Sequence, residues 1–169
     1  MIDSVILSLL PSHFLMTSSS AAKSIESSAR LLMVDDNKLG LGARRVVMEE
    51  LGYKVFMAVS PEEALSVLDA REVDLVITDY RMPSMTGTEL IAQMRSRGYQ
   101  QPVIIISGFV DALGLTEGNT GADMVIQKSA HEVAHMVRSV KNLLKPKTQR
   151  KPPAKDARGA KSLVRRQKA

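Results

Sequence analysis

Residues 74–87 of this 169-residue chain read DLVITDYRMPSMTG, and this stretch is the clearest indication of how the chain folds. Its apolar run Leu75–Ile77 has the length of a strand, and Asp79 and the turn-forming residues around Pro83 follow it. Similar short apolar runs occur at Leu31–Val34, Val55–Val59, Val103–Ile106 and Met124–Ile126. We therefore predict five strands, of which the valine and isoleucine run at 103–106 is buried on both faces.

Helix-like stretches separate these runs. Ser60-Pro61-Glu62-Glu63 is a strong helix start, with Ser60 as the N-cap and Glu63 completing a capping box. Further helices are expected at Leu39–Leu51 (ended by Gly52), at Thr88–Arg97, at Ser129–Leu144 (started by Ser129 and Glu132) and, weakened by glycines, at Phe109–Glu117. Apolar residues at helical spacing predict the buried faces of the first and last helices: Leu41, Val46, Val47 and Leu51, and Val133, Met136, Val137 and Val140. Five strands alternating with about five helices predict an α/β fold whose parallel sheet is covered on both sides.

Composition is that of an ordinary globular protein, with 44% hydrophobic and 24% charged residues. The absence of cysteine excludes disulfides and cysteine-based zinc sites. No apolar run approaches the roughly 18 residues of a membrane span. The N-terminal run Val5–Leu15 is broken by Pro11 and His13 and makes a poor signal peptide. We therefore predict a cytoplasmic protein, with residues 1–29 a disordered or mis-started lead and Met16 the true initiator.

The net charge of +5 is unevenly distributed along the chain. Ten basic residues and one acidic residue between Lys145 and Ala169 give this segment +9, which leaves −4 for the rest. Because the segment also holds three prolines and few large apolar residues, it cannot bury enough surface to fold. The predicted organisation is a lead over 1–29, one folded domain over 30–144 and a disordered basic tail over 145–169, without a second domain.

Polar side chains stand where the predicted strands end. Asp35 and Asp36 follow the first strand, Asp79 the third, Ser107 the fourth and Lys128 the fifth. In parallel sheets of this kind, ligands bind beyond the carboxyl ends of the strands. Three carboxylates crowded there repel one another unless a cation lies among them, and oxygen ligands of this type suit Mg²⁺. With the ammonium group of Lys128, the site is complementary to a phosphoryl group, which a carboxylate can accept as an aspartyl phosphate.

Each of these residues has a plainer interpretation when it is taken alone. An aspartate pair after a strand is often a helix cap and turn, and Ser107-Gly108 suits an ordinary turn. Most lysines are solvated surface groups. The occurrence of all five side chains at the same end of successive strands is hard to explain by turn chemistry, so we favour a functional site.

Four segments resemble the receiver domain of two-component response regulators: LLMVDDN (31–37), DLVITDYRMPSMTG (74–87), PVIIISG (102–108) and GADMVIQK (121–128). The resemblance covers about Arg30 to Leu144. It implies a flavodoxin-like five-stranded parallel sheet of strand order 2-1-3-4-5 with helices on both faces. It further implies a stand-alone receiver whose phosphoryl donor is a phosphohistidine on a histidine kinase or phosphotransfer protein, and which signals to a downstream protein.

The resemblance also implies a role for each acidic residue at the strand ends. Asp79 would be the phosphoacceptor. Mg²⁺ would be bound directly by Asp36, by Asp79 and by the backbone carbonyl of Arg81. Asp35 would act through a metal-bound water.

Ser107 would hydrogen-bond the phosphoryl oxygens and Lys128 would pair with them. The chain departs from the family pattern near this lysine. The family usually has proline after the lysine, often with a cis peptide bond, whereas Ser129 follows Lys128 here. A cis bond before a residue other than proline costs about 2.5–4 kcal/mol, so we expect this loop to run trans and to place Lys128 differently. Val125 occupies the family's aromatic switch position, which leaves the output route open.

The leading interpretation is a phosphorylation-controlled module that is not an enzyme, apart from catalysing its own aspartyl phosphorylation and dephosphorylation, and three other functions compete with it. One is a receiver-like scaffold that is never phosphorylated, against which the complete set of acidic, serine and lysine residues argues. Another is nucleic-acid binding through the basic tail, which has no aromatic residue for base stacking and would bind only phosphate backbones. A metal-dependent hydrolase is disfavoured because His131 and His135 fall on the last predicted helix, away from the strand ends.

Overall fold

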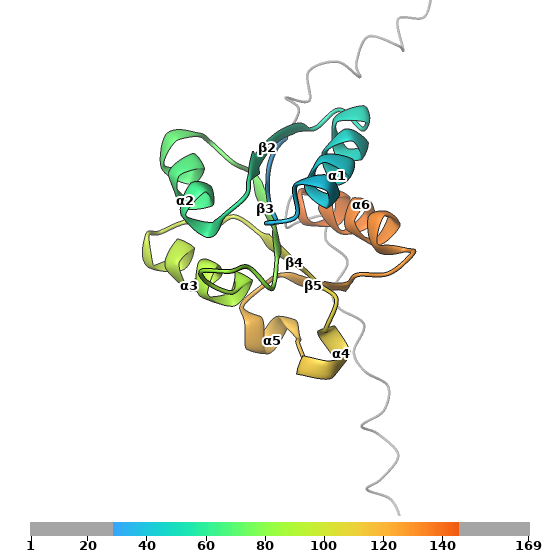
Figure 1. Ribbon diagram of the computed structural model, residues 1–169. Coiled ribbons are helices and arrows are strands. Elements are labelled where there is room, and N and C mark those ends of the chain that lie inside the picture. Colours follow the sequence, from blue (N-terminus) through green and yellow to red (C-terminus); the bar gives the residue numbers. More distant parts are fainter. Residues whose placement is uncertain (1–28, 146–169) are drawn as a thin grey trace, which may run out of the picture.

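A five-stranded parallel sheet forms the centre of the protein in a computed structural model that describes residues 29–145 (Figure 1). Its strands are β1 (Arg30–Val34), β2 (Lys54–Ala58), β3 (Leu75–Asp79), β4 (Val103–Ser107) and β5 (Met124–Gln127). They pair in the order β2-β1-β3-β4-β5, which confirms the predicted flavodoxin-like topology. The predicted lead 1–29 and basic tail 145–169 lie outside the described residues, apart from Ala29 and Lys145.

Helices cover both faces of this sheet. They are α1 (Lys38–Glu50), α2 (Pro61–Ala70), α3 (Gly87–Ser96), α4 (Val110–Leu113), α5 (Glu117–Thr120) and α6 (Glu132–Leu143). Figure 1 shows α1 and α6 on one face and α2 and α3 on the other, with the short α4 and α5 beside the β5 edge. None of the helices between residues 29 and 145 is sufficiently long and apolar to cross a bilayer.

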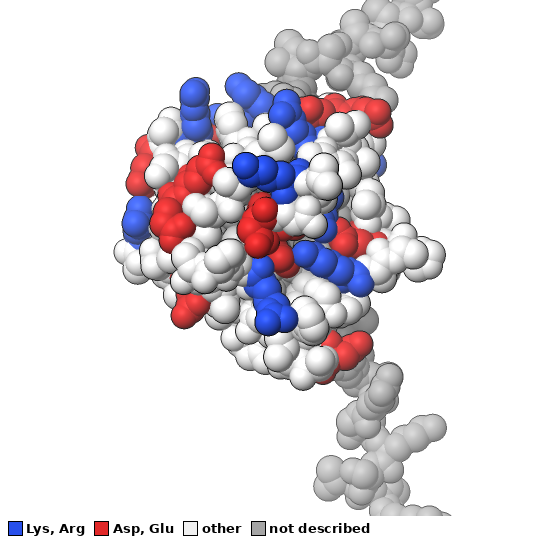
Figure 2. Space-filling view, in the orientation of Figure 1, with Lys and Arg blue, Asp and Glu red and all other residues white. Residues whose placement is uncertain are grey.

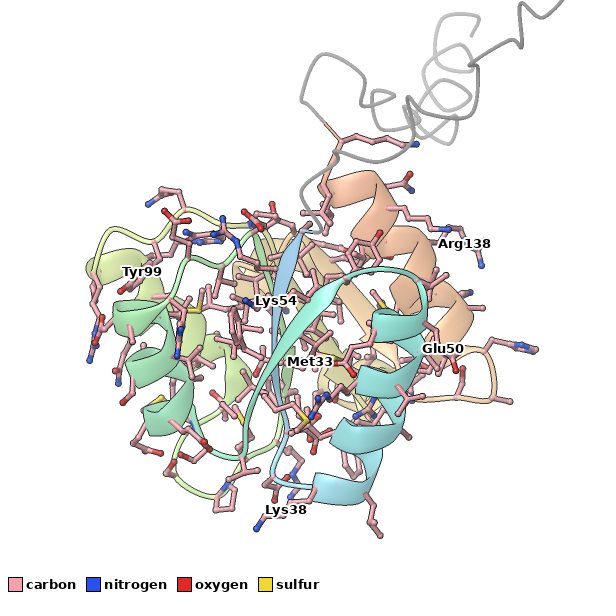
Figure 3. The ribbon with its side chains drawn as sticks, turned by 90° about the horizontal axis from the view of Figure 1, so that it is seen from above. Met33, Lys38, Glu50, Lys54, Tyr99 and Arg138 are labelled. Carbon is pink, nitrogen blue, oxygen red and sulfur yellow. The ribbon has the colours of Figure 1, made fainter. Side chains whose placement is uncertain are left out.

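The core is divided by the sheet into two layers. Side chains alternate along β1, so Leu31 and Met33 pack toward α1 and α6, whereas Leu32 and Val34 pack toward α2 and α3. All five residues of β3 and all five of β4 are buried, as expected for central strands of a sheet covered on both faces. Figure 3 labels Lys38, just beyond the carboxyl end of β1, and Tyr99, in the segment between α3 and β4.

The buried face of α1 differs from the sequence prediction. Val46 and Leu51 were expected in the core but are 54% and 44% exposed. The face that packs on the sheet instead runs through Leu41, Arg44 and Met48, whose spacing of three and four residues is helical. Because a basic residue lies in the middle of this buried face, the pattern of apolar residues alone does not predict it.

The start of α6 also differs from the prediction. The helix begins at Glu132 and not at Ser129, whose hydroxyl oxygen accepts the N–H of His131 at 3.2 Å in the preceding turn. Val133 is 39% exposed, while the acidic Glu132 is buried on the same face as Met136. A charged residue has again taken a place on the core-facing side.

The start of α2 follows the prediction more closely. The Ser60 hydroxyl oxygen accepts the N–H of Glu63 at 3.2 Å, as an N-cap should. The carboxylate of Glu63 reaches one residue further back than a capping box requires and accepts the N–H of Val59 at 2.8 Å.

Candidate functional site

Three aspartates meet at the carboxyl edge of the sheet. Asp35 and Asp36 follow β1, and Asp79 is the last residue of the neighbouring strand β3. One carboxylate oxygen from each lies within 4.8 Å of the others. Asp35 and Asp79 are buried, whereas Asp36 is exposed. These three residues, called the acidic cluster below, form a group that could hold a metal ion.

Lys128 supplies positive charge to the acidic cluster. Its ammonium nitrogen lies 3.1 Å from Asp79 Oδ2 and 3.6 Å from Asp35 Oδ2. Its backbone N–H donates to the Ser107 carbonyl at 2.8 Å. All peptide bonds between residues 29 and 145 are trans, including the one before Ser129, as expected. The trans loop therefore still brings the lysine to the carboxylates.

The environment of Asp79 opposes its ionisation. Burial raises the pKa of the Asp79 carboxyl above its ordinary value, and the nearby charge of Asp35 adds to this. The hydrogen bond and charge of Lys128, and the N–H that Tyr80 donates to Asp79 Oδ1 at 2.8 Å, work in the opposite direction without cancelling the effect. A cation placed in the cluster would favour the ionised, nucleophilic form.

Ser107 and Arg81 both lie near the carboxyl ends of neighbouring strands, Ser107 at the end of β4 and Arg81 just after β3. Ser107 is buried at the end of β4, and its hydroxyl oxygen accepts the N–H of Phe109 at 3.1 Å. Arg81 lies two residues beyond Asp79, and its guanidinium stacks on the Phe109 ring with 4.8 Å between Cζ and the ring centre. The loops that follow β3 and β4 are thus in contact at the mouth of the site.

Gly87 holds the loop after β3 against the strand. Its N–H donates to the Tyr80 carbonyl at 2.8 Å. A Cβ atom at this position would lie 2.6 Å from the backbone oxygen of Asp79, closer than real contacts allow. Only glycine permits this approach, so Gly87 helps to fix the backbone of Asp79.

Two residues of the site escaped the sequence analysis. Arg44 Nη1 lies 2.8 Å from Asp35 Oδ2, and Arg44 Nε lies 2.5 Å from Glu132 Oε1. Burial by itself lowers the pKa of Arg44, but the hydrogen bond to Glu132 and the charges of Glu132 and Asp35 leave it above its ordinary value. The available signal was a charged residue on the apolar stripe of each helix, Arg44 between Leu41 and Met48 on α1 and Glu132 one turn before Met136 on α6.

Gln127 was also missed. Its side-chain amide donates to the Gly108 carbonyl at 2.9 Å, and its carbonyl oxygen accepts the N–H of Val110 at 3.0 Å. One side chain next to Lys128 therefore ties the loop after Ser107 to β5.

The distribution of charge supports placing the site at this edge. Figure 2 shows acidic side chains in the middle of the face at the carboxyl ends of the strands, with lysine and arginine side chains around them. This arrangement can attract both a cation and a phosphoryl group.

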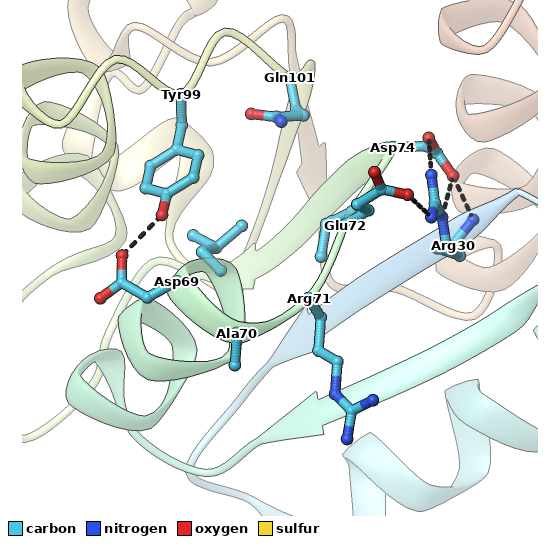
Figure 4. Close-up of a pocket in the computed structure, with 10 residues that line it drawn as sticks. Arg30, Asp69, Ala70, Arg71, Glu72, Asp74, Tyr99 and Gln101 are labelled. Carbon is cyan, nitrogen blue, oxygen red and sulfur yellow. Dashed lines mark hydrogen bonds and ion pairs between the residues drawn. The ribbon is translucent and has the colours of Figure 1, made fainter.

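A hollow of about 530 Å³ lies at the other end of the strands, beside the amino ends of β1 and β3 (Figure 4). Its carboxylates already have partners, since Glu72 and Asp74 pair with Arg30 and Asp69 accepts the Tyr99 hydroxyl at 2.6 Å. Among the described residues, the three carboxylates that converge within 4.8 Å and could hold a metal ion are those of the acidic cluster, so we do not place the site in this hollow.

A family model described as the response regulator receiver domain matches residues 31–141. The transcriptional regulatory protein GlrR of Escherichia coli is 38% identical over 92 residues, which are 53% of this chain and 21% of GlrR. The virulence sensor protein BvgS of Bordetella pertussis is 36% identical over 94 residues, 53% of this chain and 8% of BvgS. The chain thus spans only a small part of these curated relatives.

Solved structures show the same similarity over nearly their whole length. A receiver domain protein of Methanospirillum hungatei superposes with a TM-score of 0.63 at 27% identity, covering 70% of this chain and 94% of that one. The response regulator TrrA of Thermotoga maritima, crystallised in complex with Mg²⁺ and beryllofluoride, gives a TM-score of 0.56 at 29% identity, covering 68% and 98%.

Proposed function

Because the chain belongs to the response regulator receiver domain family, a phosphorylation-controlled module of two-component signalling, we propose that it accepts a phosphoryl group on Asp79. The observation that supports this most strongly is the position of Asp79. It ends the central strand β3, lies in the acidic cluster and has the Lys128 ammonium 3.1 Å from its carboxylate.

The proposed reaction is a transfer between two nucleophiles. A carboxylate oxygen of Asp79 attacks the phosphorus of a phosphohistidine on a histidine kinase or phosphotransfer protein. The new oxygen–phosphorus bond forms as the phosphorus–nitrogen bond breaks, and the histidine leaves with the bonding electrons. The product is an aspartyl phosphate. We propose that the protein is not an enzyme toward other molecules and that it catalyses only its own phosphorylation and dephosphorylation.

The cofactor we propose is Mg²⁺. Asp36, Asp79 and the backbone carbonyl of Arg81 would hold it directly, with Asp35 acting through a bound water. The carboxylate oxygens within 4.8 Å of one another are the donor set that this hard cation prefers. When bound, it would neutralise charge on the phosphoryl oxygens.

Lys128 and Ser107 would complete the site. The Lys128 ammonium lies beside the Asp79 carboxylate and would pair with an oxygen of a phosphoryl group attached there. Ser107 can turn its hydroxyl from the loop toward the phosphoryl group and donate to it, giving up the N–H of Phe109. The signal would then pass to a downstream protein, and we propose that this occurs in the cytoplasm.

Intact mass spectrometry tests the proposed phosphorylation. After incubation with acetyl or carbamoyl phosphate and Mg²⁺, the wild-type protein should gain the mass of one phosphoryl group. Asp79→Asn should not, whereas the matched variant Asp111→Asn, which changes an exposed aspartate on α4, should behave as the wild type. An undiminished gain in Asp79→Asn would show that another residue is the acceptor.

Thermal melting tests the proposed metal site separately. A ligand that binds only the folded protein raises the melting temperature by mass action. Mg²⁺ should raise that of the wild type and raise that of Asp36→Ala much less. An equal rise in both proteins would place the cation elsewhere.

A further inference from the structure

Arg44 connects the acidic cluster to the first turn of α6. Its Nη1 lies 2.8 Å from Asp35 Oδ2 and its Nε 2.5 Å from Glu132 Oε1. The side chains of Arg44, Asp35 and Glu132 are only 12%, 4% and 11% exposed. Since water and salt barely reach these groups, the charges act on one another with little screening.

Both carboxylate oxygens of Asp35 already have partners within the protein. Oδ2 faces Arg44 and, at 3.6 Å, the Lys128 ammonium. Oδ1 accepts the N–H of Asn37 at 2.8 Å. A cation that enters the acidic cluster must therefore share Asp35 with the guanidinium of Arg44.

We propose that Arg44 is a positioning residue that acts as the resident counter-ion of the acidic cluster. It balances Asp35 while the cluster holds no metal ion, and it lowers the affinity of the cluster for a divalent cation. Glu132 holds Arg44 in place, and its negative charge partly offsets the positive charge that Arg44 presents to Asp35. The inference rests on the proposed function in one respect, that the cluster binds a divalent cation.

The two partners should act on cation binding with opposite sign. Removing the charge of Arg44 removes a repulsive cation from beside Asp35, so a divalent ion should bind more tightly. Without the charge of Glu132, the guanidinium of Arg44 pairs with Asp35 alone, and one negative charge near the acidic cluster is lost. The divalent ion should therefore bind more weakly. A purely structural ion pair predicts a different result, because breaking it from either side would loosen the site and weaken binding in both variants.

The experiment titrates the full-length protein with Mn²⁺ at low salt and follows free Mn²⁺ by electron paramagnetic resonance. Arg44→Gln should bind Mn²⁺ about tenfold more tightly than the wild type. Arg44→Lys, which keeps the charge, should stay near the wild type, and Glu132→Gln should bind more weakly. Arg45→Gln is the matched control, because Arg45 is on the same helix but pairs with the exposed Glu49 at 2.8 Å. Its affinity should not change.

A double variant keeps the test decisive where Arg44→Gln fails to fold. Arg44→Gln with Glu132→Gln replaces the buried charges by two amides that can hydrogen-bond to each other. It should bind Mn²⁺ more tightly than Glu132→Gln alone. Equal or weaker binding, in the single variant or in this comparison, would overturn the inference.

Asp36→Asn separates this inference from the proposed function. Suppose that the wild type binds Mn²⁺ and that Asp36→Asn weakens this binding. If Arg44→Gln then fails to strengthen binding, only the role of Arg44 is wrong. If Asp36→Asn binds as the wild type does, or if no variant binds Mn²⁺, the proposed metal site is wrong and the role of Arg44 is wrong with it.

Discussion

Gly87 is the residue at which the smallest change should disturb the site most. An added Cβ would lie 2.6 Å from the backbone oxygen of Asp79, where no flexible side chain can give way. We expect Gly87→Ala to reduce the free energy of unfolding by about 1–3 kcal/mol, measured by urea denaturation. It should also slow phosphorylation, because the backbone of Asp79 has to shift.

Gly42 provides the control for this prediction. It lies inside α1, and nothing approaches within 4 Å of where its Cβ would be. Gly42→Ala should therefore raise the free energy of unfolding by about 0.5–1 kcal/mol through helix propensity. A loss of stability equal to that of Gly87→Ala would refute the argument from close approach.

The raised pKa of Asp79 predicts a pH dependence of stability in metal-free protein. The folded state holds the Asp79 proton more tightly than the unfolded state, in which the pKa is about 3.9. The resulting stabilisation is complete below that value and is lost as the pH rises through the higher folded pKa. Asp79→Asn has no such loss. Its free energy of unfolding relative to the wild type should therefore increase from pH about 4 upward and then level off.

Urea denaturation in EDTA between pH 4 and 8 measures this difference. Asp111→Asn, at an exposed position, should show no comparable trend against the wild type. A relative stability of Asp79→Asn that grows as the pH falls would mean that Lys128 outweighs burial at Asp79.

At the scale of elements, the loop after β4 is the segment best placed to respond to phosphorylation. The short helix α4 has no buried residue, and Gln127 ties the loop to β5 through Gly108 and Val110. When the Ser107 hydroxyl turns to a phosphoryl group, its hydrogen bond from Phe109 has to break. Beryllofluoride with Mg²⁺ should therefore change amide hydrogen exchange most between residues 108 and 121, and less around Val125.

Gln127→Ala tests the part of this route that belongs to β5. Without the side-chain amide, the Val110 N–H should exchange faster even when beryllofluoride is absent. If β5 and α6 respond most to beryllofluoride, the signal takes another route. If neither region responds, phosphorylation does not switch this domain.

The elements also show what sequence reasoning can predict. The strands were found to within about two residues, since short apolar runs bounded by polar residues are a local property, as is the Ser60 cap. The meeting of Asp35, Asp36 and Asp79 follows from the parallel order of β1 and β3. The bond between Arg44 and Glu132 joins residues 88 positions apart, and no local pattern predicts such a pairing. The start of α6 was misplaced at Ser129 for a local reason, because the hydroxyl of Ser129 caps the turn before the helix and not the helix itself.

For the whole molecule, α6 is the element that completes one of the two core layers. Met136 and Val140 are buried against the sheet, and Leu143 and Leu144 pack at the edge of this layer. Removing residues 145–169 should therefore leave cooperative urea unfolding with an unchanged midpoint. A truncation that begins at Val140 should abolish cooperative unfolding, because it removes core residues. A clear loss of stability from the first truncation would show that the basic segment supports the fold.

The central claim, that Asp79 accepts the phosphoryl group, is tested most directly by locating the modified residue. The protein is incubated with acetyl phosphate and Mg²⁺, the acyl phosphate is reduced with borohydride, and the peptides are analysed by mass spectrometry. The account predicts that Asp79, in the peptide that contains the end of β3, is converted to homoserine, while Asp35 and Asp36 remain aspartate. Homoserine at position 35 or 36, or its absence from position 79 in a protein that has gained the phosphoryl mass, would contradict the account.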